Sequence, residues 1–196
     1  MSAKRDRNVP PGILDARRRI ISNKVMKDTI HVDKYGFETK GEYTQGTLLC
    51  KPGGGPPLHF HRSYSEKFVA LEGDLIVYLD GEKLTLKPGE SATVPAGKTH
   101  TFTAEGETDI KFTGYCIPAH SGFEKSLYIM YGLANDGFAD EEGLPKSLVQ
   151  KALIADMSDM RFTGGAGGFM NLVNGLLAGY ARWSGEEERL LRKYWD

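Results

Sequence analysis

Three histidines and one glutamate are the residues of this chain whose types and spacing best suit metal chemistry. One residue separates His59 from His61, four residues separate His61 from Glu66, and His100 follows later in the chain. Imidazole nitrogens with one carboxylate oxygen suit Fe, Mn, Ni, Cu or Zn, whereas Mg and Ca favour sites with more oxygens. We therefore expect one divalent transition metal, bound by His59, His61, Glu66 and His100.

The spacing of these residues fits short β-strands. Successive residues of a strand face opposite sides, so His59 and His61 share one face. The polar segment 62–65 is short enough to turn the chain, which lets Glu66 open the next strand. His100 begins a further strand after a Pro-Ala-Gly turn. Separate strands would thus bring the four side chains into one cavity.

Glycines and a proline recur around these residues at fixed distances. The pattern is Gly53-x5-His59-x-His61-x4-Glu66-x6-Gly73, then Gly89-x5-Pro95-x-Gly97-x2-His100-x3-Ala104. It resembles the two-motif signature of the cupin superfamily, G(x)5HxH(x)3–4E(x)6G and G(x)5PxG(x)2H(x)3N. Ala104 stands where the motif has Asn. That position is not normally a ligand, so the resemblance still implies metal binding, with altered hydrogen bonding near the site.

The resemblance implies a mostly β fold, a cupin jelly-roll (double-stranded β-helix) barrel with an α-helical C-terminal extension. Short apolar runs separated by turn residues agree with a barrel or sandwich. We expect an N-terminal arm at 1–22, a barrel at 23–120 and the helical extension at 121–196. The expected strands are 28–32, 44–50, 58–61, 67–71, 74–79, 83–86, 91–94, 100–103 and 109–117.

The two ends of the chain read differently from the barrel. The arm is basic, and we expect it to be flexible or to form a short helix. In the extension, Pro145 precedes one apolar stripe, Leu148 to Met157, and a second stripe runs from Phe169 to Trp183. We expect these stripes to cover a barrel face or a second subunit. A lipid-surface helix is the alternative, because the second stripe is strongly apolar. The stripe spans only roughly 22 Å, so it cannot cross a ~30 Å hydrocarbon core.

Composition narrows the partners. The chain has 196 residues and a formal net charge of −1, which gives no general electrostatic attraction to nucleic acid. We do not expect its first residues to act as a secretory signal, and no run is long enough for a membrane span. We interpret Cys50 and Cys116 as buried, reduced thiols in a cytoplasmic protein. We also expect a homodimer, because cupin barrels commonly pair.

Our leading hypothesis is a dioxygenase-like oxidoreductase that acts on a small organic molecule. Glu66 would act as a base after leaving the metal, and Phe68, Phe102 and Phe112 would line the substrate pocket or simply fill the barrel core. Arg62 and Tyr64 are expected mainly at the surface. The alternatives are a non-catalytic, metal-dependent protein that binds or senses a small molecule, and a metal-dependent sugar-phosphate isomerase. The isomerase would require several basic residues in the cavity.

Overall fold

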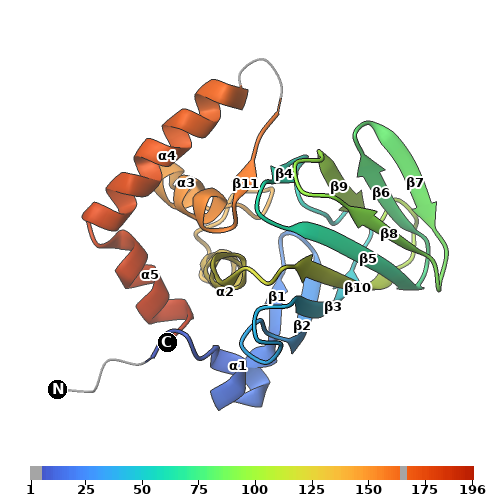
Figure 1. The fold of residues 1–196 in the computed structure, drawn as a ribbon, viewed down its shortest axis with the longest axis horizontal. Helices are drawn as coiled ribbons and strands as arrows, with labels where there is room; N and C mark the ends of the chain where they lie inside the picture. Colours follow the sequence, from blue (N-terminus) through green and yellow to red (C-terminus); the bar gives the residue numbers. More distant parts are fainter. Residues whose placement is uncertain (1–5, 164–166) are drawn as a thin grey trace.

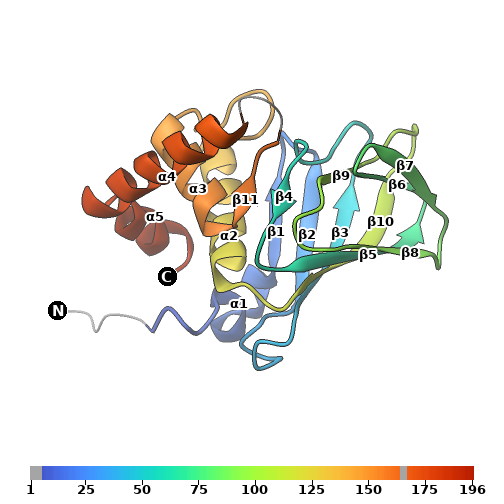
Figure 2. The ribbon, with the colours of Figure 1, turned by 45° about the horizontal axis from the view of Figure 1, so that its top comes forward.

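The computed structural model describes residues 6–163 and 167–196 and places strands on one side of the molecule and helices on the other (Figure 1). Helices and strands each make up 31% of the chain. The expected mostly β class is therefore only approximate, because the helices of the extension are longer than the strands. One helix, α2 (Ser121–Asn135), lies between the sheets and the last two helices, α4 (Gly167–Trp183) and α5 (Glu186–Tyr194) (Figure 2).

The strands form antiparallel sheets. A six-stranded sheet has the order β1-β2-β3-β10-β5-β8, a three-stranded sheet the order β7-β6-β9, and a two-stranded sheet joins β11 to β4. Nine of these strands match the expected runs to within a few residues. The bounds are β1 Ile20–Asn23, β2 Asp28–Lys34, β3 Thr44–Cys50, β4 Phe60–His61, β5 Ser65–Glu72, β6 Leu75–Leu79, β7 Glu82–Leu86, β8 Ser91–Val94, β9 His100–Thr103, β10 Ile110–Ile117 and β11 Met160–Arg161.

Strand alternation builds the interior. In β5 and β10 every second residue points inward, and the larger of these side chains are Phe68 and Phe112. They pack against Leu75 and Val77 of the three-stranded sheet in one buried apolar cluster. The cluster joins the two larger sheets face to face, which holds the strands that carry the metal-site residues in fixed positions.

The turn between β6 and β7 shows how local sequence fixes the pairing of the strands. Asp80 and Gly81 both have positive φ, 49° and 88°. A two-residue hairpin turn with both φ values positive matches the twist of the flanking strands, and Asp-Gly is a preferred sequence for it. The turn sets the register in which Leu79 faces Glu82.

The helices form a second core against the other end of the six-stranded sheet. The remaining helices are α1 Pro11–Leu14, a 3-10 turn at Ala16–Arg19, α3 Leu148–Met157, α4 Gly167–Trp183 and α5 Glu186–Tyr194. Ile129 of α2 and Leu153 of α3 pack with Ile30 and Val32 of β2. The buried Glu124 ties α2 to the sheet, since it accepts hydrogen bonds from the amide of Gly36 and, at 2.6 Å, the hydroxyl of Thr44. The extension and the six-stranded sheet therefore share this second core.

The N-terminal segment is bound to the body of the protein. The expected short helix is present as α1, and residues 20–23 form β1, which pairs with β2. Arg7 forms ion pairs with Glu188 and, at 2.8 Å, with Asp196. Arg18 donates to the main-chain oxygen of Asp196 at 2.6 Å. These contacts hold the described start of the chain beside its C-terminal helix (Figure 1).

The apolar stripe of α4 does not cover the sheets. The helix packs on α3 and α5 through small residues, Ala178 and Ala181, while Phe169, Leu176 and Trp183 are exposed. For this stripe, the first of the two predicted alternatives, a barrel face, is therefore wrong, and cover by a second subunit stays a prediction. In α3, Leu148 is also exposed, and the helix begins there behind Ser147 rather than at Pro145. Among the described residues no helix is long and apolar enough to span a bilayer.

Candidate metal centre

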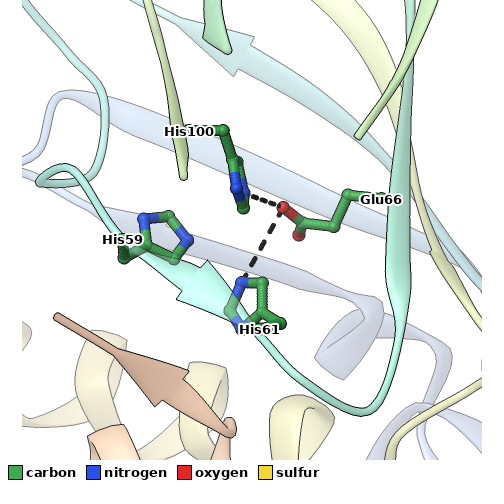
Figure 3. A group of neighbouring side chains, drawn as sticks. All are labelled: His59, His61, Glu66 and His100. Atoms are coloured by element: carbon green, nitrogen blue, oxygen red, sulfur yellow. Dashed lines mark hydrogen bonds and ion pairs between the residues drawn. The ribbon is translucent and has the colours of Figure 1, made fainter. Parts of the chain in front are cut away.

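Four side chains from separate parts of the β structure converge on one point (Figure 3). His59 immediately precedes β4, His61 ends it, Glu66 lies in β5 and His100 begins β9. One possible ligand atom from each residue lies within 4.8 Å of the others. The backbone fixes part of this arrangement, since the amides of His59 and His100 donate to each other's carbonyl oxygens at 3.0 and 2.7 Å. The predicted ligand set is thus brought together.

The three imidazoles use their two ring nitrogens in the same way. The Nδ1 atom of each ring lies near a main-chain oxygen, at 2.7 Å for His59 and Pro57, 3.1 Å for His61 and Ser158, and 3.0 Å for His100 and Lys98. A carbonyl oxygen can only accept, so each Nδ1 carries the proton in these bonds and donates it. The Nε2 atoms are then the ones available to a metal, as in most histidine metal sites.

The Nε2 atoms meet the carboxylate of Glu66. His100 Nε2 lies 2.6 Å from Glu66 Oε2, and His61 Nε2 lies 3.8 Å from the same oxygen. His61 Nε2 is buried and has no hydrogen-bond partner. A buried nitrogen without a partner is destabilising by about 1–3 kcal/mol, and a coordinated cation would satisfy it. The residues present therefore fit a divalent transition metal held by three nitrogens and a carboxylate.

The charges of the site are suited to a cation. Burial favours the neutral form of Glu66, but the hydrogen bond from His100 and the electrostatic attraction of the neighbouring imidazoles outweigh burial and lower the pKa of Glu66 to about 2. Burial lowers the pKa of His59 to about 3 and also lowers that of His61. For His100, the partnership with Glu66 outweighs burial and raises the pKa. Glu66 is thus ionised and two imidazoles are neutral, the states in which they ligate metals.

The helical extension supports the site directly, which the sequence analysis missed. The backbone after α3 brings Ser158 against His61, and β11 pairs Met160 with His61. Asp159 (φ 49°) accepts hydrogen bonds from the amides of Arg62 and Ser63, both at 2.8 Å. No motif marks this segment, and only the left-handed conformation, for which Asp is enriched, sets it apart.

Tyr64 belongs to the site and not to the surface as predicted. Its side chain is buried, and its hydroxyl lies 2.8 Å from both His61 Nδ1 and the main-chain oxygen of Ser158. The ring also stacks on the imidazole of His61, with centroids 4.3 Å apart. The side chain of Arg62 is exposed as expected, but its guanidinium is bound to Asp159 at 3.0 Å.

An apolar cavity of about 140 Å³ adjoins the centre. His59, His61 and Glu66 form part of its wall, and side chains of β2, β3, β10 and α2 form much of the rest. The three predicted pocket residues, Phe68, Phe102 and Phe112, all line it. They also contact one another, with ring centroids 4.9 to 6.0 Å apart. The three rings therefore both fill the core and line the cavity, the two roles that the sequence left open.

Several residues near the motif lie outside the centre. Ala104 is buried in the core cluster, and its backbone pairs with Gly53. His31 is exposed and pairs with Asp33, while His120 caps α2 by accepting from the amide of Phe123 at 3.0 Å. Among the residues that the structure describes, the four predicted ligands form the one cluster suited to a metal.

Comparison with known families identifies the strand-rich part. Residues 46–118, which include all four metal-site residues, match the family model of the cupin domain. This part of the chain is a cupin domain. The predicted resemblance to the cupin superfamily is thereby confirmed. None of the curated proteins compared with the chain matches it at a significant level.

Solved structures with the cupin fold are similar to this chain at low identity. A predicted oxalate decarboxylase from Thermotoga maritima is 20% identical over 46% of this chain and 80% of its own, with a TM-score of 0.45. A cupin-superfamily sugar phosphate isomerase from Silicibacter pomeroyi is 21% identical over 49% and 63%, with a TM-score of 0.43. An RmlC-like cupin from Shewanella frigidimarina is 21% identical over 50% and 83%, with a TM-score of 0.44. Similarity at this level assigns no reaction to this cupin.

Proposed function

We propose that this cupin is a metal-dependent enzyme of the dioxygenase type that acts on a small, largely apolar organic molecule. The observation that carries the proposal is the convergence of three imidazoles and one carboxylate at the wall of an apolar cavity of about 140 Å³. Water is largely excluded there, since His59, His61 and His100 are all buried. We also propose that the antiparallel sheets form the jelly-roll barrel expected of the superfamily.

The roles of the residues follow from their contacts. His59, His61 and His100 would hold the metal through Nε2, and Glu66 would complete the set through a carboxylate oxygen. Once bound, Fe, Mn, Ni, Cu or Zn would supply Lewis-acid or redox chemistry at this wall of the cavity. The backbone oxygens that accept from the Nδ1 atoms keep the rings fixed, so the protein needs little reorganisation to bind the ion.

Glu66 remains our candidate for the catalytic base. A carboxylate is a weak base when its pKa is held at about 2, as it is beside His100. Glu66 would therefore gain basicity only when the Nε2 of His100 is engaged by the metal and the carboxylate swings away from it. The role of a metal ligand does not need that movement.

Phe68, Phe102 and Phe112 would set the size and polarity of the substrate. A cavity of about 150 Å³ lined by apolar side chains is large enough for benzene, and the cavity here has a similar volume. We propose a substrate of that size whose oxygen or sulfur atoms reach the metal and whose apolar part packs on the rings.

The structure favours one alternative function and disfavours another. A metal-dependent binding or sensing protein is favoured by the contact between His61 and Ser158, because it would transmit occupancy of the site to the helices. A sugar-phosphate isomerase is disfavoured, since no lysine or arginine is among the described residues that line the cavity. Lys98 is exposed and paired with Asp80.

The first test is elemental analysis of protein purified without chelator. We expect about one Fe, Mn, Ni, Cu or Zn per chain in the wild type and in His31→Ala, a control histidine on the surface, and none in His59→Ala. Oxygen uptake with a panel of diols, diketones and thiols then separates the two classes. Metal binding without oxygen consumption would refute the dioxygenase and support the binding protein, and a metal-free wild type would refute both.

Two further points remain proposals. Cys50 and Cys116 are both buried and unpaired, which supports the proposed location in the reducing cytoplasm. The small-molecule partner is proposed on the cavity alone. Labelling with a thiol reagent before and after unfolding would test whether the two cysteines are reduced, because unpaired buried thiols react only after unfolding.

A further inference from the structure

A carboxylate far from the metal centre lines the same cavity. Asp28, the first residue of β2, is only 9% exposed. Its Oδ2 accepts a hydrogen bond of 2.6 Å from the hydroxyl of Tyr131, while its Oδ1 has no hydrogen-bond partner. Asp28 and Glu66 both belong to the wall of the cavity of about 140 Å³. The same cavity is thus lined by two carboxylates, one in the candidate metal centre and one outside it.

The register of the sheet separates the two carboxylates. Glu66 is aligned with Cys116 and through it with Thr44, at the start of β3, whereas Asp28 is aligned with Cys50, at its end. At ~3.3 Å per residue, the six steps from Thr44 to Cys50 correspond to about 20 Å between main chains. Side chains reaching inward shorten this separation. The cavity between them is therefore elongated, with the metal centre and Asp28 toward opposite ends.

The protein itself gives Asp28 no positive partner at the cavity. The side chains around it there are mainly apolar, Met26, Ile30 and Leu48 among them, and the described lining contains no lysine or arginine. Burial raises the pKa of Asp28 to about 6, although the hydrogen bond from Tyr131 opposes the rise. A buried carboxylate oxygen without a hydrogen-bond partner destabilises the folded state. Folding does not explain its presence.

We propose that Asp28 is a second anchor for the ligand. The ligand would present chelating oxygens to the metal centre at one end of a short apolar body and a hydrogen-bond donor, hydroxyl or ammonium, to Asp28 Oδ1 at the other. Tyr131 acts as a positioning residue that fixes the carboxylate through Oδ2. This inference rests on the proposed metal-dependent function and narrows its substrate class to elongated molecules with polar groups at both ends.

The test uses linear hydroxamates of about four to eight carbons, a length range set by the cavity volume, which end in methyl, hydroxyl or ammonium. Affinities for the zinc-loaded protein are measured by calorimetry. At the best length we expect a hydroxyl or ammonium end to bind about 10-fold tighter than a methyl end, or more, because a hydrogen bond to a charged group contributes ~1.5–3 kcal/mol. The preferred end group identifies the donor.

The variants separate Asp28 from the metal centre. In Asp28→Asn the preference should fall below about 3-fold, while binding of the methyl-ended compounds is retained. Asp33→Asn, on the same strand but outside the cavity lining, should behave like wild type. Equal affinities for all end groups, or a preference that survives in Asp28→Asn, would overturn the proposal. If Asp28→Asn does not fold, Tyr131→Phe is used and should weaken the preference.

A second set of ligands tests Asp28 independently of the metal centre. Hexylamine and hexanol carry a donor but no chelating group, so they test Asp28 in protein stripped of metal. Binding of these compounds that is lost in Asp28→Asn supports the second anchor even when hydroxamates do not bind. Absence of both kinds of binding counts against Asp28 as well.

A second inference concerns the exposed face of α4. Phe169, Leu172, Leu176, Tyr180 and Trp183 are 71%, 62%, 69%, 52% and 83% exposed. Four of them, with Gly179, follow steps of three and four residues, from Phe169 through Leu172 and Leu176 to Trp183. This is the spacing of the apolar seam along which two helices pack. The face is therefore patterned like one half of a helix pair.

The glycines of α4 support this reading independently. A Cβ atom added at Gly168, Gly175 or Gly179 would meet nothing within 4 Å. Packing within this chain therefore does not require glycine at these positions. Glycine in a helix is destabilising by about 1 kcal/mol relative to alanine. Small residues on an exposed apolar face allow the backbone of another helix to approach closely.

The chemistry of the face indicates a second copy of the chain. The one charged residue of α4 is Arg182, which is paired with Asp156 at 2.8 Å and with Glu187 at 2.9 Å. Helices that lie on lipid surfaces carry rows of Lys and Arg beside the apolar face, and α4 does not. The three aromatic residues alone expose about 400 Å², taking ~200 Å² for each full side chain. The leucines bring the face toward the ~800 Å² per partner of a stable interface.

We infer that two chains pair through α4 about a twofold axis. In an antiparallel pair the midpoint of the seam lies near Leu176, so this residue meets its own counterpart while Phe169 of one chain faces Trp183 of the other. Light scattering should give the mass of a dimer for wild type and for Phe138→Glu, an exposed control outside α4, and the mass of a monomer for the double variant Leu172→Glu, Leu176→Glu. Leu176→Cys should form an interchain disulfide on oxidation.

Three results would overturn this inference. A wild-type protein that is monomeric at all concentrations tested excludes the pair. A wild-type monomer that binds vesicles of phosphatidylcholine and phosphatidylserine, with binding lost in Leu172→Glu, Leu176→Glu, identifies a lipid surface as the occupant of this face. A dimer that persists in the double variant places the interface elsewhere.

Discussion

The main-chain oxygen of Ser158 lies 3.1 Å from the Nδ1 atom of His61, although 97 residues separate them in the chain. The same oxygen accepts a hydrogen bond of 2.8 Å from Tyr64. The helical extension therefore fixes the tautomer and the ring plane of one predicted ligand. A cupin domain cut off after β10 would lack this support.

Replacing Tyr64 by Phe should weaken metal binding without unfolding the protein. The ring would still stack on His61, but the hydroxyl between His61 and Ser158 would be lost. Groups that orient a ligand in this way typically affect metal affinity by about 10–100-fold, and we expect the lower end because Ser158 remains. Competition with a chelating dye measures the affinity. Tyr78→Phe, a surface tyrosine, is the control, and equal affinities in both variants would contradict the role of Tyr64.

Asp159→Asn should loosen the turn that follows His61. Asn tolerates the left-handed conformation of this position, so the variant removes the carboxylate with little added strain. Asp159 accepts from the amides of Arg62 and Ser63 through Oδ2. An Asn oxygen can still accept these bonds but carries no charge, so the bonds weaken and the free energy of unfolding should fall by about 1–3 kcal/mol. Denaturant unfolding measures it. Unchanged stability together with unchanged metal affinity would show that the turn holds without the carboxylate.

Asp28→Asn should make the protein more stable at neutral pH. The folded-state pKa of Asp28 is raised from 3.8 to about 6, so the folded protein binds the proton more tightly than the unfolded chain. Stability is therefore lost as the pH rises from about 4 to about 6, and the loss approaches about 3 kcal/mol above that window. Unfolding at several pH values should show a gain for the variant that is complete at pH 7 and absent near pH 3. Asp33→Asn is the control, and a gain independent of pH would contradict the assignment.

Glu66→Gln distinguishes a ligand from a base. The amide keeps the shape but lacks the charge that balances the cation, so metal affinity should fall by at least about 10-fold if Glu66 is a ligand. Addition of zinc to stripped wild-type protein should raise Tm, since a ligand present at 1,000 times its Kd stabilises by about 4 kcal/mol. The rise should shrink in Glu66→Gln and in His100→Ala. Full metal content with lost turnover would instead identify Glu66 as a base alone.

Phe112→Ala and Phe102→Ala should separate core packing from the cavity wall. Phe112 is completely buried, so its truncation should reduce the free energy of unfolding by about 3–5 kcal/mol. Phe102 is only partly buried, and we expect a smaller loss together with a larger change in ligand affinity. Denaturant unfolding and hydroxamate titration measure the two effects. Equal losses of stability without any change in affinity would make both residues core alone.

Nine strands, their turns and the four residues of the candidate metal centre could be predicted from the sequence. These features are local: strand alternation sets the face of each residue, and turn residues such as Asp80 and Gly81 set the register. The histidines and Glu66 stand at fixed distances from such turns, so spacing along the chain translates into position in space. The small N-terminal strand β1 was missed because it has only four residues, which pair with β2 only after the turn at residues 24–27 reverses the chain.

The surroundings of the centre could not be predicted from the sequence, because they depend on how distant segments pack. Ser158, Asp159 and Tyr131 come from the extension and carry no motif, since a main-chain oxygen or a single side chain leaves no periodic signal. The orientation of α4 was also beyond the sequence, because both its small face and its large apolar face are suited to packing. The fold buries Ala178 and Ala181 where α4 packs on α3 and α5 and leaves Trp183 exposed, because small side chains let neighbouring helices pack closely.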